Sequence, residues 1–239
     1  MLASGLVYSG LVVSFLGALT TARSRRRPEG LVVMAAGVTM TAIGFLLPAR
    51  ESRVRRAISQ LDRFIPAWQF NEVHTITVAA PPDKVYEAIR HVRADEVSLF
   101  RALTWIRRGG RKSRPGSLLD ARDAALIDAA LESGFVTLAD EPPYELVVGI
   151  ILAAPRIRKE QPLRDLFLGD LPPGYTVAAM NFAVAPDGKG GSRITTETRV
   201  IASSDDLRRK FALYWRTIYP GSALIRRMWL RAIARRALR

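Results

Sequence analysis

Two long runs of uncharged, mostly apolar residues near the N-terminus restrict the possible folds of this chain more than any other feature. Leu2–Ala22 has 21 residues without a charged side chain, and Gly30–Pro48 has 19. As helices rising about 1.5 Å per residue, both runs are long enough to cross a hydrocarbon core of roughly 30 Å. Arginines among residues 23–27 separate the two runs. Residues 1–49 are therefore predicted to form a transmembrane helical hairpin.

A cleaved signal peptide and a helical hairpin buried inside a soluble protein are the other interpretations of these runs. A signal peptide carries positive charge before its apolar run, whereas the arginines here follow the first run. Small residues at helical spacing let two helices approach closely in lipid, and both runs contain them. They are Gly10, Ser14 and Gly17 in the first run and Gly37, Thr41 and Gly44 in the second. The membrane interpretation is therefore preferred.

The formal net charge of +14 is concentrated at the two ends of the chain. Residues 1–66 carry a net charge of +6 and residues 205–239 a net charge of +8, which leaves residues 67–204 neutral overall. A domain that grips nucleic acid normally carries a basic face on its body, so no nucleic-acid partner is expected. Basic ends beside apolar runs instead predict membrane lipids, especially anionic ones, as partners.

Residues 50–69 are predicted to form a basic amphipathic linker helix. Val54, Ile58 and Leu61 recur among arginines at helical spacing. Such a helix either lies in the membrane interface or is a plain linker that ends before a proline. The turn between the runs holds four arginines and residues 50–63 hold five, so these charges alone do not orient the hairpin. The basic C-terminal region favours a cytoplasmic location for the soluble domain.

Residues 70–239 are predicted to form an α+β domain that contains an antiparallel sheet and ends in a long helix. Runs rich in β-branched and aromatic residues predict strands at 73–78, 135–139, 144–152, 176–185 and 193–202. Apolar periodicity predicts helices following Pro81, over 96–105 and 118–133, and a short one at 163–168. The glycine-rich stretch Asp187–Gly191 predicts a hairpin between the last two strands.

The C-terminal helix is expected over residues 203–238. Ser203 and Ser204 are suited to capping its N-terminus, and the acids Asp205 and Asp206 follow them near the positive end of the helix. Apolar and aromatic residues then recur at steps of mostly three, four or seven, with arginines on much of the remaining surface. Pro220-Gly221 interrupts the pattern, which predicts a kink or two abutting helices.

The residue types available restrict the chemistry. The chain has no cysteine and two histidines, so neither a metal site nor a cofactor is expected. Residues 107–116 form a basic, glycine-rich stretch without the spacing of a P-loop. A solvated loop is the preferred interpretation of this stretch, and contact with lipid headgroups is the second. The sequence sets no oligomeric state.

Two local stretches, together with the order of the elements, resemble the START-like (SRPBCC) superfamily of polyketide cyclase/dehydrase and lipid-transport type. The first stretch is His74–Val78 followed by residues 80–89, and the second is Arg193–Val200 followed by residues 205–238. The resemblance covers roughly Phe70–Leu238 and implies a helix-grip fold, in which a curved antiparallel sheet wraps around the C-terminal helix and leaves an apolar cavity. The two N-terminal apolar runs are an addition to the usual pattern of this superfamily.

Within a helix-grip fold, alternation along the strands selects the residues that would line the cavity. The sheet would contribute Tyr144, Leu146, Val148, Ile150, Met180, Phe182, Val184, Ile194, Thr196, Thr198 and Val200. The C-terminal helix would contribute Phe211, Tyr214, Trp215 and Ile218. The alternative is that all of these residues are packed core.

Polar residues that could perform catalysis are few: His74 in the first strand and Glu197 and Arg199 in the last. A structural histidine and a structural Glu197–Arg199 ion pair are the plainer interpretations. Three functions remain open: a membrane-anchored module that binds a hydrophobic small molecule, an enzyme of cyclase or dehydratase type, and an interaction platform with a filled cavity. The binding module, without catalysis, is preferred.

Overall fold

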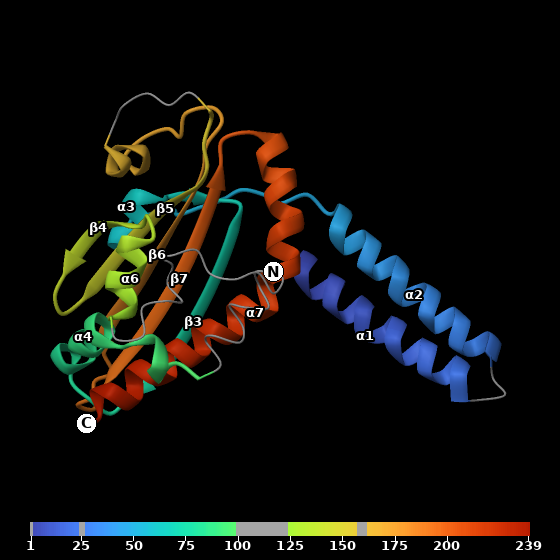
Figure 1. The fold of residues 1–239 in the computed structure, drawn as a ribbon, viewed down its shortest axis with the longest axis horizontal. Helices are drawn as coiled ribbons and strands as arrows, with labels where there is room; N and C mark the ends of the chain where they lie inside the picture. Colours follow the sequence, from blue (N-terminus) through green and yellow to red (C-terminus); the bar gives the residue numbers. More distant parts are fainter. Residues whose placement is uncertain (1, 24–26, 99–123, 157–161) are drawn as a thin grey trace. The chain divides into compact units, whose positions relative to one another are not determined.

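The computed structural model describes residues 2–23, 27–98, 124–156 and 162–239. Figure 1 shows the helical N-terminal region, the sheet and the long C-terminal helix. The chain divides into two compact units: Met1–Arg50 with Arg209–Tyr219, and Glu51–Arg208 with Pro220–Arg239. The C-terminal helix therefore contributes to both units.

The first unit contains a close pair of apolar helices, α1 (Leu2–Arg23) and α2 (Arg27–Leu46). Their interface is formed by the predicted small residues: a Cβ atom added to Gly37 would lie 2.4 Å from the Ser14 backbone nitrogen and 2.6 Å from the Gly10 carbonyl oxygen. Away from this interface the apolar side chains are exposed, with Phe15 at 64% and Val32 at 69% of full exposure. Both helices are long and apolar enough to span a membrane.

The predicted helix over residues 50–69 is wrong, because most of this segment is not helical. The two-residue strands β1 (Ser52–Arg53) and β2 (Ala67–Trp68) pair antiparallel, and only α3 (Gln60–Phe64) is an α-helix between them. Ser59 caps α3 and forms a capping box with Asp62. The cap starts the helix at residue 60. The pairing of β1 with β2 keeps Ser52 and Arg53 extended.

A five-stranded antiparallel sheet forms the centre of the second unit, with the strand order β3-β7-β6-β5-β4. The strands are β3 (Phe70–Val78), β4 (Val136–Glu141), β5 (Glu145–Ala153), β6 (Thr176–Pro186) and β7 (Ser192–Ala202). The predicted β6–β7 hairpin is present, and Gly188 and Gly190 take the positive φ values of 76° and 85° in its turn. The Asp187 side chain stabilises this turn by accepting hydrogen bonds from the Lys189 and Gly191 amides, at 2.7 and 2.9 Å.

One face of the sheet, called the inner face here, carries the buried side chains Leu146, Val148, Met180, Phe182, Val184 and Ile194. The helices α4 (Pro82–His91) and α6 (Leu126–Glu132) pack against it, and so does the part of α7 (Asp205–Ala237) that follows Pro220 (Figure 1). Phe182 meets Trp229 of α7 edge to face, with 5.1 Å between ring centroids. Of the helix predicted over 118–133, residues 118–123 lie outside the described residues, and the helix that the structure describes is α6, which begins at Leu126.

The opposite face of the sheet, called the outer face, is also covered. Leu61, Phe64 and Ile65 from α3 and its C-terminal end pack with Val147 and Val177 of the sheet. The 3-10 helix η2 (Leu163–Phe167), close to the predicted 163–168, adds Leu166 and Phe167 to this cluster. Another 3-10 helix, η1 (Ala94–Glu96), ends at the start of the predicted 96–105 helix, and residues 97 and 98 are not helical. Residues 99–105 of that prediction and the basic 107–116 stretch lie outside the described residues.

α7 is a single helix of 33 residues that contains Pro220 in its interior. Its first half and its second half belong to different units, with the boundary at this proline. The four predicted cavity residues Phe211, Tyr214, Trp215 and Ile218 precede Pro220 and lie in the unit of α1 and α2. The residues of α7 that pack on the inner face are Ile225, Trp229, Leu230, Ala232, Ile233 and Ala237. The expectation that the earlier aromatic residues line a cavity with the sheet stays a prediction.

Candidate functional site

A buried cluster of polar side chains lies between β3 and α7 on the inner face. Glu72 Oε1 is 2.7 Å from His74 Nε2, and the Ser222 hydroxyl donates to Glu72 Oε2 at 2.8 Å. The side chains of Glu72 and His74 are only 1% and 9% exposed. A carboxylate, an imidazole and a hydroxyl thus share one buried location, which we call the Glu72 cluster.

The Glu72 cluster follows from strand alternation and from the register of the sheet. Residues 72 and 74 are two apart on β3, so their side chains point to the same face. In the register with β7, Glu72 pairs with Thr198 and His74 pairs with Thr196. Thr196 is buried, and its hydroxyl donates to the Asn181 carbonyl at 2.8 Å. The two predicted threonines therefore border the cluster on the inner face.

A methionine sulfur from β6 and an arginine from α7 also lie on the inner face. Met180 of β6 pairs with Thr198 of β7, two strands away from Glu72. The Arg226 guanidinium, from α7, contacts the Met180 sulfur and lies 5.6 Å from the centroid of the Trp229 ring. The inner face therefore combines a few polar groups with a mostly apolar surface that packs against α4, α6 and the second half of α7.

Most of the sheet residues predicted for the cavity lie on the inner face. Val148, Met180, Phe182 and Thr196 are buried there, and Thr198 and Ile150 are partly buried. Tyr144 differs: it precedes β5, is 59% exposed and lines a surface hollow instead. Of the three predicted catalytic residues, only His74 is in the Glu72 cluster.

Glu197 and Arg199 alternate with Thr196 and Thr198, so they point to the outer face. The Arg199 guanidinium binds Glu197 Oε1 at 2.8 Å and Asp62 Oδ1 at 2.7 Å. It also donates to the Ile65 carbonyl at 3.0 Å and stacks 4.0 Å from the centroid of the Trp68 ring. Because these partners come from α3, its C-terminal end and β2, Arg199 fastens that segment to the sheet. The structure therefore supports the structural interpretation of this pair.

A second polar group on the outer face was missed in the sequence. Glu145 of β5 accepts hydrogen bonds from the Gln60 amide at 2.7 Å and from Asn181 Nδ2 at 2.6 Å. Glu72, Ser222 and Arg226 were also not predicted. An acid within an otherwise apolar strand is the available signal for Glu145, and the spacing of two from His74 is the signal for Glu72.

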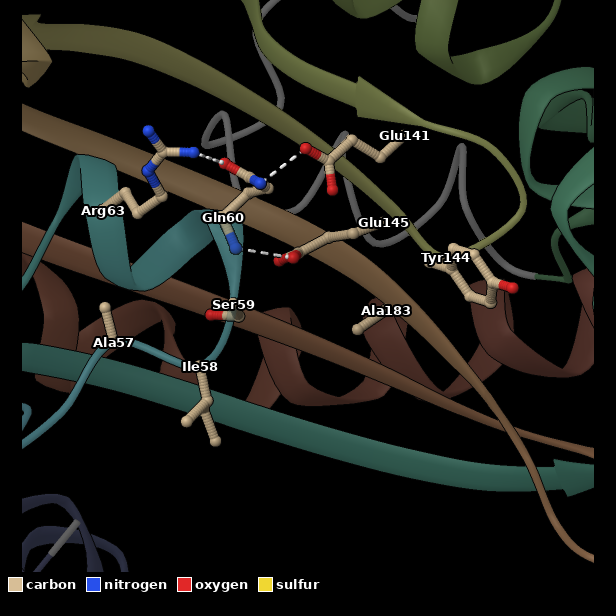
Figure 2. Close-up of a pocket in the computed structure, with 9 residues that line it drawn as sticks. All are labelled: Ala57, Ile58, Ser59, Gln60, Arg63, Glu141, Tyr144, Glu145 and Ala183. Carbon is tan, nitrogen blue, oxygen red and sulfur yellow. Dashed lines mark hydrogen bonds between the residues drawn. The ribbon is translucent and has the colours of Figure 1, made fainter.

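An open surface hollow of about 440 Å³ lies beside α3, lined by Ala57, Ile58, Ser59, Gln60, Arg63, Glu141, Tyr144, Glu145 and Ala183. Figure 2 shows the Gln60 side chain between Arg63 and Glu141, with hydrogen bonds of 3.2 and 2.5 Å. Its polar groups already bind one another, and Tyr144 and Ile58 are exposed at its rim. The hollow thus offers little enclosed apolar surface.

Among the described residues, no group of three or more His, Asp or Glu side chains is placed to hold a metal ion. A scan against protein-family models gives no match to the chain, and a search of the curated proteins gives none either. The functional assignment therefore rests on the fold and on the residues of the Glu72 cluster.

Proposed function

We propose that the protein is a membrane-anchored binding module that holds a hydrophobic small molecule between the inner face of the sheet and the second half of α7. The resemblance to START-like helix-grip domains implies this arrangement, and the ligand would be lipid-like or polyketide-like. The observation that carries the proposal is the Glu72 cluster, which is buried on an otherwise apolar face. Apolar sites with few polar groups bind the body of a ligand by burial and orient its polar end.

Burial of an acyl chain favours such binding strongly. Each methylene removed from water contributes about 0.8 kcal/mol, so a ligand of several methylenes would stay bound after leaving a bilayer. The Glu72 carboxylate already accepts from Ser222 and bonds His74, which keeps these groups in fixed orientations. A ligand with a polar end group would meet a preorganised cluster rather than mobile side chains.

The proposal is tested by native mass spectrometry of the full-length protein released gently from membranes. The wild type is expected to carry a co-purifying hydrophobic molecule, and Glu72→Gln and His74→Ala are expected to carry less of it. Thr77→Ala is the matched control, because Thr77 is an exposed residue on the same strand with its side chain on the opposite face. Equal occupancy in all four proteins, or no ligand in any of them, would contradict a binding role.

An enzyme of cyclase or dehydratase type is the second candidate, and the Glu72–His74 contact of 2.7 Å favours it. A histidine oriented by a carboxylate is a common general base. Loss of turnover in His74→Ala with unchanged ligand binding would identify an enzyme. Absence of turnover in every variant would leave the binding module.

We also propose that the second unit faces the cytoplasm. Arg216 of α7 donates hydrogen bonds to the carbonyls of Phe45 and Leu47, so the basic first half of α7 lies at the end of the hairpin from which Arg50 continues. Arg209, Lys210 and Arg216 add to the arginines of residues 50–63 at this end, and excess positive charge marks the cytoplasmic side. With an impermeant maleimide on intact cells, Ser24→Cys is expected to be labelled and Thr77→Cys to be protected. The reverse pattern would overturn this orientation.

A further inference from the structure

The first half of α7 is bound to the two apolar helices, which neither the resemblance nor the Glu72 cluster explains. Arg209–Tyr219, called the interface segment here, forms a compact unit with α1 and α2. Arg216 is only 3% exposed, and its guanidinium donates to the carbonyls of Phe45 and Leu47. Those carbonyls lie at and just beyond the C-terminal end of α2, where a helix leaves acceptors without intrahelical partners.

A second connection comes from α1. The Tyr8 hydroxyl bonds the Arg216 carbonyl and lies 3.1 Å from the Thr217 carbonyl. The interface segment is thus tied to both apolar helices, near the start of α1 and at the end of α2. If those helices span the bilayer, this end of the hairpin lies at the boundary between hydrocarbon and headgroups.

The composition of the interface segment suits that boundary. Phe211, Trp215 and Tyr219 follow one another at steps of four, with ring centroids 5.9 and 6.2 Å apart. Trp215 is buried, whereas Tyr214 is 42% exposed. Tyrosine is enriched at membrane–water interfaces, where the ring is apolar and its polar atom reaches water. Leu213 is 54% exposed, and the basic side chain of Arg209 is exposed as well. An amphipathic, basic and aromatic helix of this kind lies in the plane of the interface.

We propose that the interface segment is a third membrane-contacting element, which lies among the headgroups of one leaflet and binds anionic phospholipid through Arg209 and its neighbours. A bilayer is the occupant that the structure favours, because the segment is joined by hydrogen bonds to the two helices long enough to span one. Its positive charge is complementary to anionic lipid. The proposal does not depend on a ligand in the inner-face site.

The absence of cysteine from the chain makes a depth measurement direct, because a single introduced cysteine is the only one to be labelled. Spin labels at Leu213→Cys and at the control Arg231→Cys are compared in full-length protein reconstituted into vesicles of phosphatidylcholine and phosphatidylglycerol. Arg231 is exposed and belongs to the other half of α7. The label at residue 213 is expected to collide with oxygen and to be shielded from a water-soluble nickel chelate, and the label at residue 231 to behave oppositely. Equal access of the nickel chelate to both labels would overturn the proposal.

Headgroup selectivity is tested with a second pair of variants. Arg209→Gln is expected to weaken the preference for phosphatidylglycerol over phosphatidylcholine about fivefold, the effect of one cation near an anionic surface. Arg227→Gln is the control, since Arg227 is exposed and follows Pro220. The preference is read from the immobilised fraction of spin-labelled lipids around the protein. An unchanged preference in Arg209→Gln, or an equal loss in both variants, would contradict binding by this segment.

Discussion

Replacement of Arg199 by alanine gives the strongest test of the arrangement on the outer face. The substitution leaves the carboxylates of Asp62 and Glu197, with side-chain exposures of 4% and 18%, without their shared cation. Removal of one partner from a buried ion pair costs about 3 to 5 kcal/mol. A domain of this size loses about 2 to 4 °C in Tm per kcal/mol, so Tm is expected to fall by about 6 to 20 °C.

The assay is thermal unfolding of full-length protein in detergent, followed by circular dichroism. Arg193→Ala is the matched control, because Arg193 is on the same strand and exposed, and its Tm is expected to change by about 2 °C or less. If Arg199→Ala melted within this range, the interpretation of Arg199 as the residue that fastens α3 to the sheet would be wrong.

The pH dependence of the same pair provides an independent check. Burial raises the pKa of Asp62, but the Ile58 amide and the Arg199 guanidinium outweigh it, so the pKa lies below the ordinary value of 3.8. Because the pKa of Asp62 is lower in the folded state than in the unfolded state, its ionised form stabilises the protein at pH values above the unfolded-state pKa. This contribution to stability is lost as the pH falls through the folded-state pKa. In Arg199→Ala the Asp62 carboxylate has lost its cation, so protonation at low pH removes an unpaired buried charge and stabilises the variant. The Tm difference between wild type and variant is therefore expected to narrow from neutral pH to about pH 3.

Two further predictions concern packing in the hairpin and a buried phenol. Gly37→Leu is expected to force α1 and α2 apart, because an added Cβ would lie 2.4 Å from the Ser14 amide nitrogen, whereas Gly5→Leu, with no atom within 4 Å, is the tolerated control. Disulfide formation between single cysteines on the two helices measures their separation, and equal yields in both variants would contradict the packing. Burial, followed by the hydrogen bond to Asp140, raises the pKa of Tyr86. Stability should thus decline above about pH 10, where the unfolded tyrosine ionises first, and Tyr86→Phe should lose less in melts at rising pH.

The sheet could be predicted from the sequence because its signals are local. β-branched runs between proline and glycine turns locate the strands of the five-stranded sheet, although β3 begins at Phe70 rather than at Val73. The small-residue faces of α1 and α2 were also predictable, since helical periodicity alone sets which residues meet. Residues 50–69 were not, because the Ser59 cap and the pairing of β1 with β2 outweigh a helical spacing of apolar residues.

The candidate site was predictable only in part. Strand alternation correctly separates Thr196 from Glu197, but the contact between Glu72 and Ser222 joins residues 150 positions apart, and no local pattern reports it. Pro220-Gly221 predicts a break between the two halves of α7, but both halves share one apolar periodicity, so no local signal assigns Phe211 and Ile225 to different units. That division depends on tertiary contacts such as those of Arg216 with the end of α2.

Because α7 runs through both units, a cut after Arg50 does not release a self-contained soluble domain. A shortened chain that began at Glu51 would keep the whole sheet and contain neither apolar N-terminal helix. It would nevertheless retain the buried Arg216 without the carbonyls of Phe45 and Leu47, together with the aromatic residues around it. Such a product is expected to aggregate in aqueous buffer. The intact chain should therefore be purified, with detergent present from the first step.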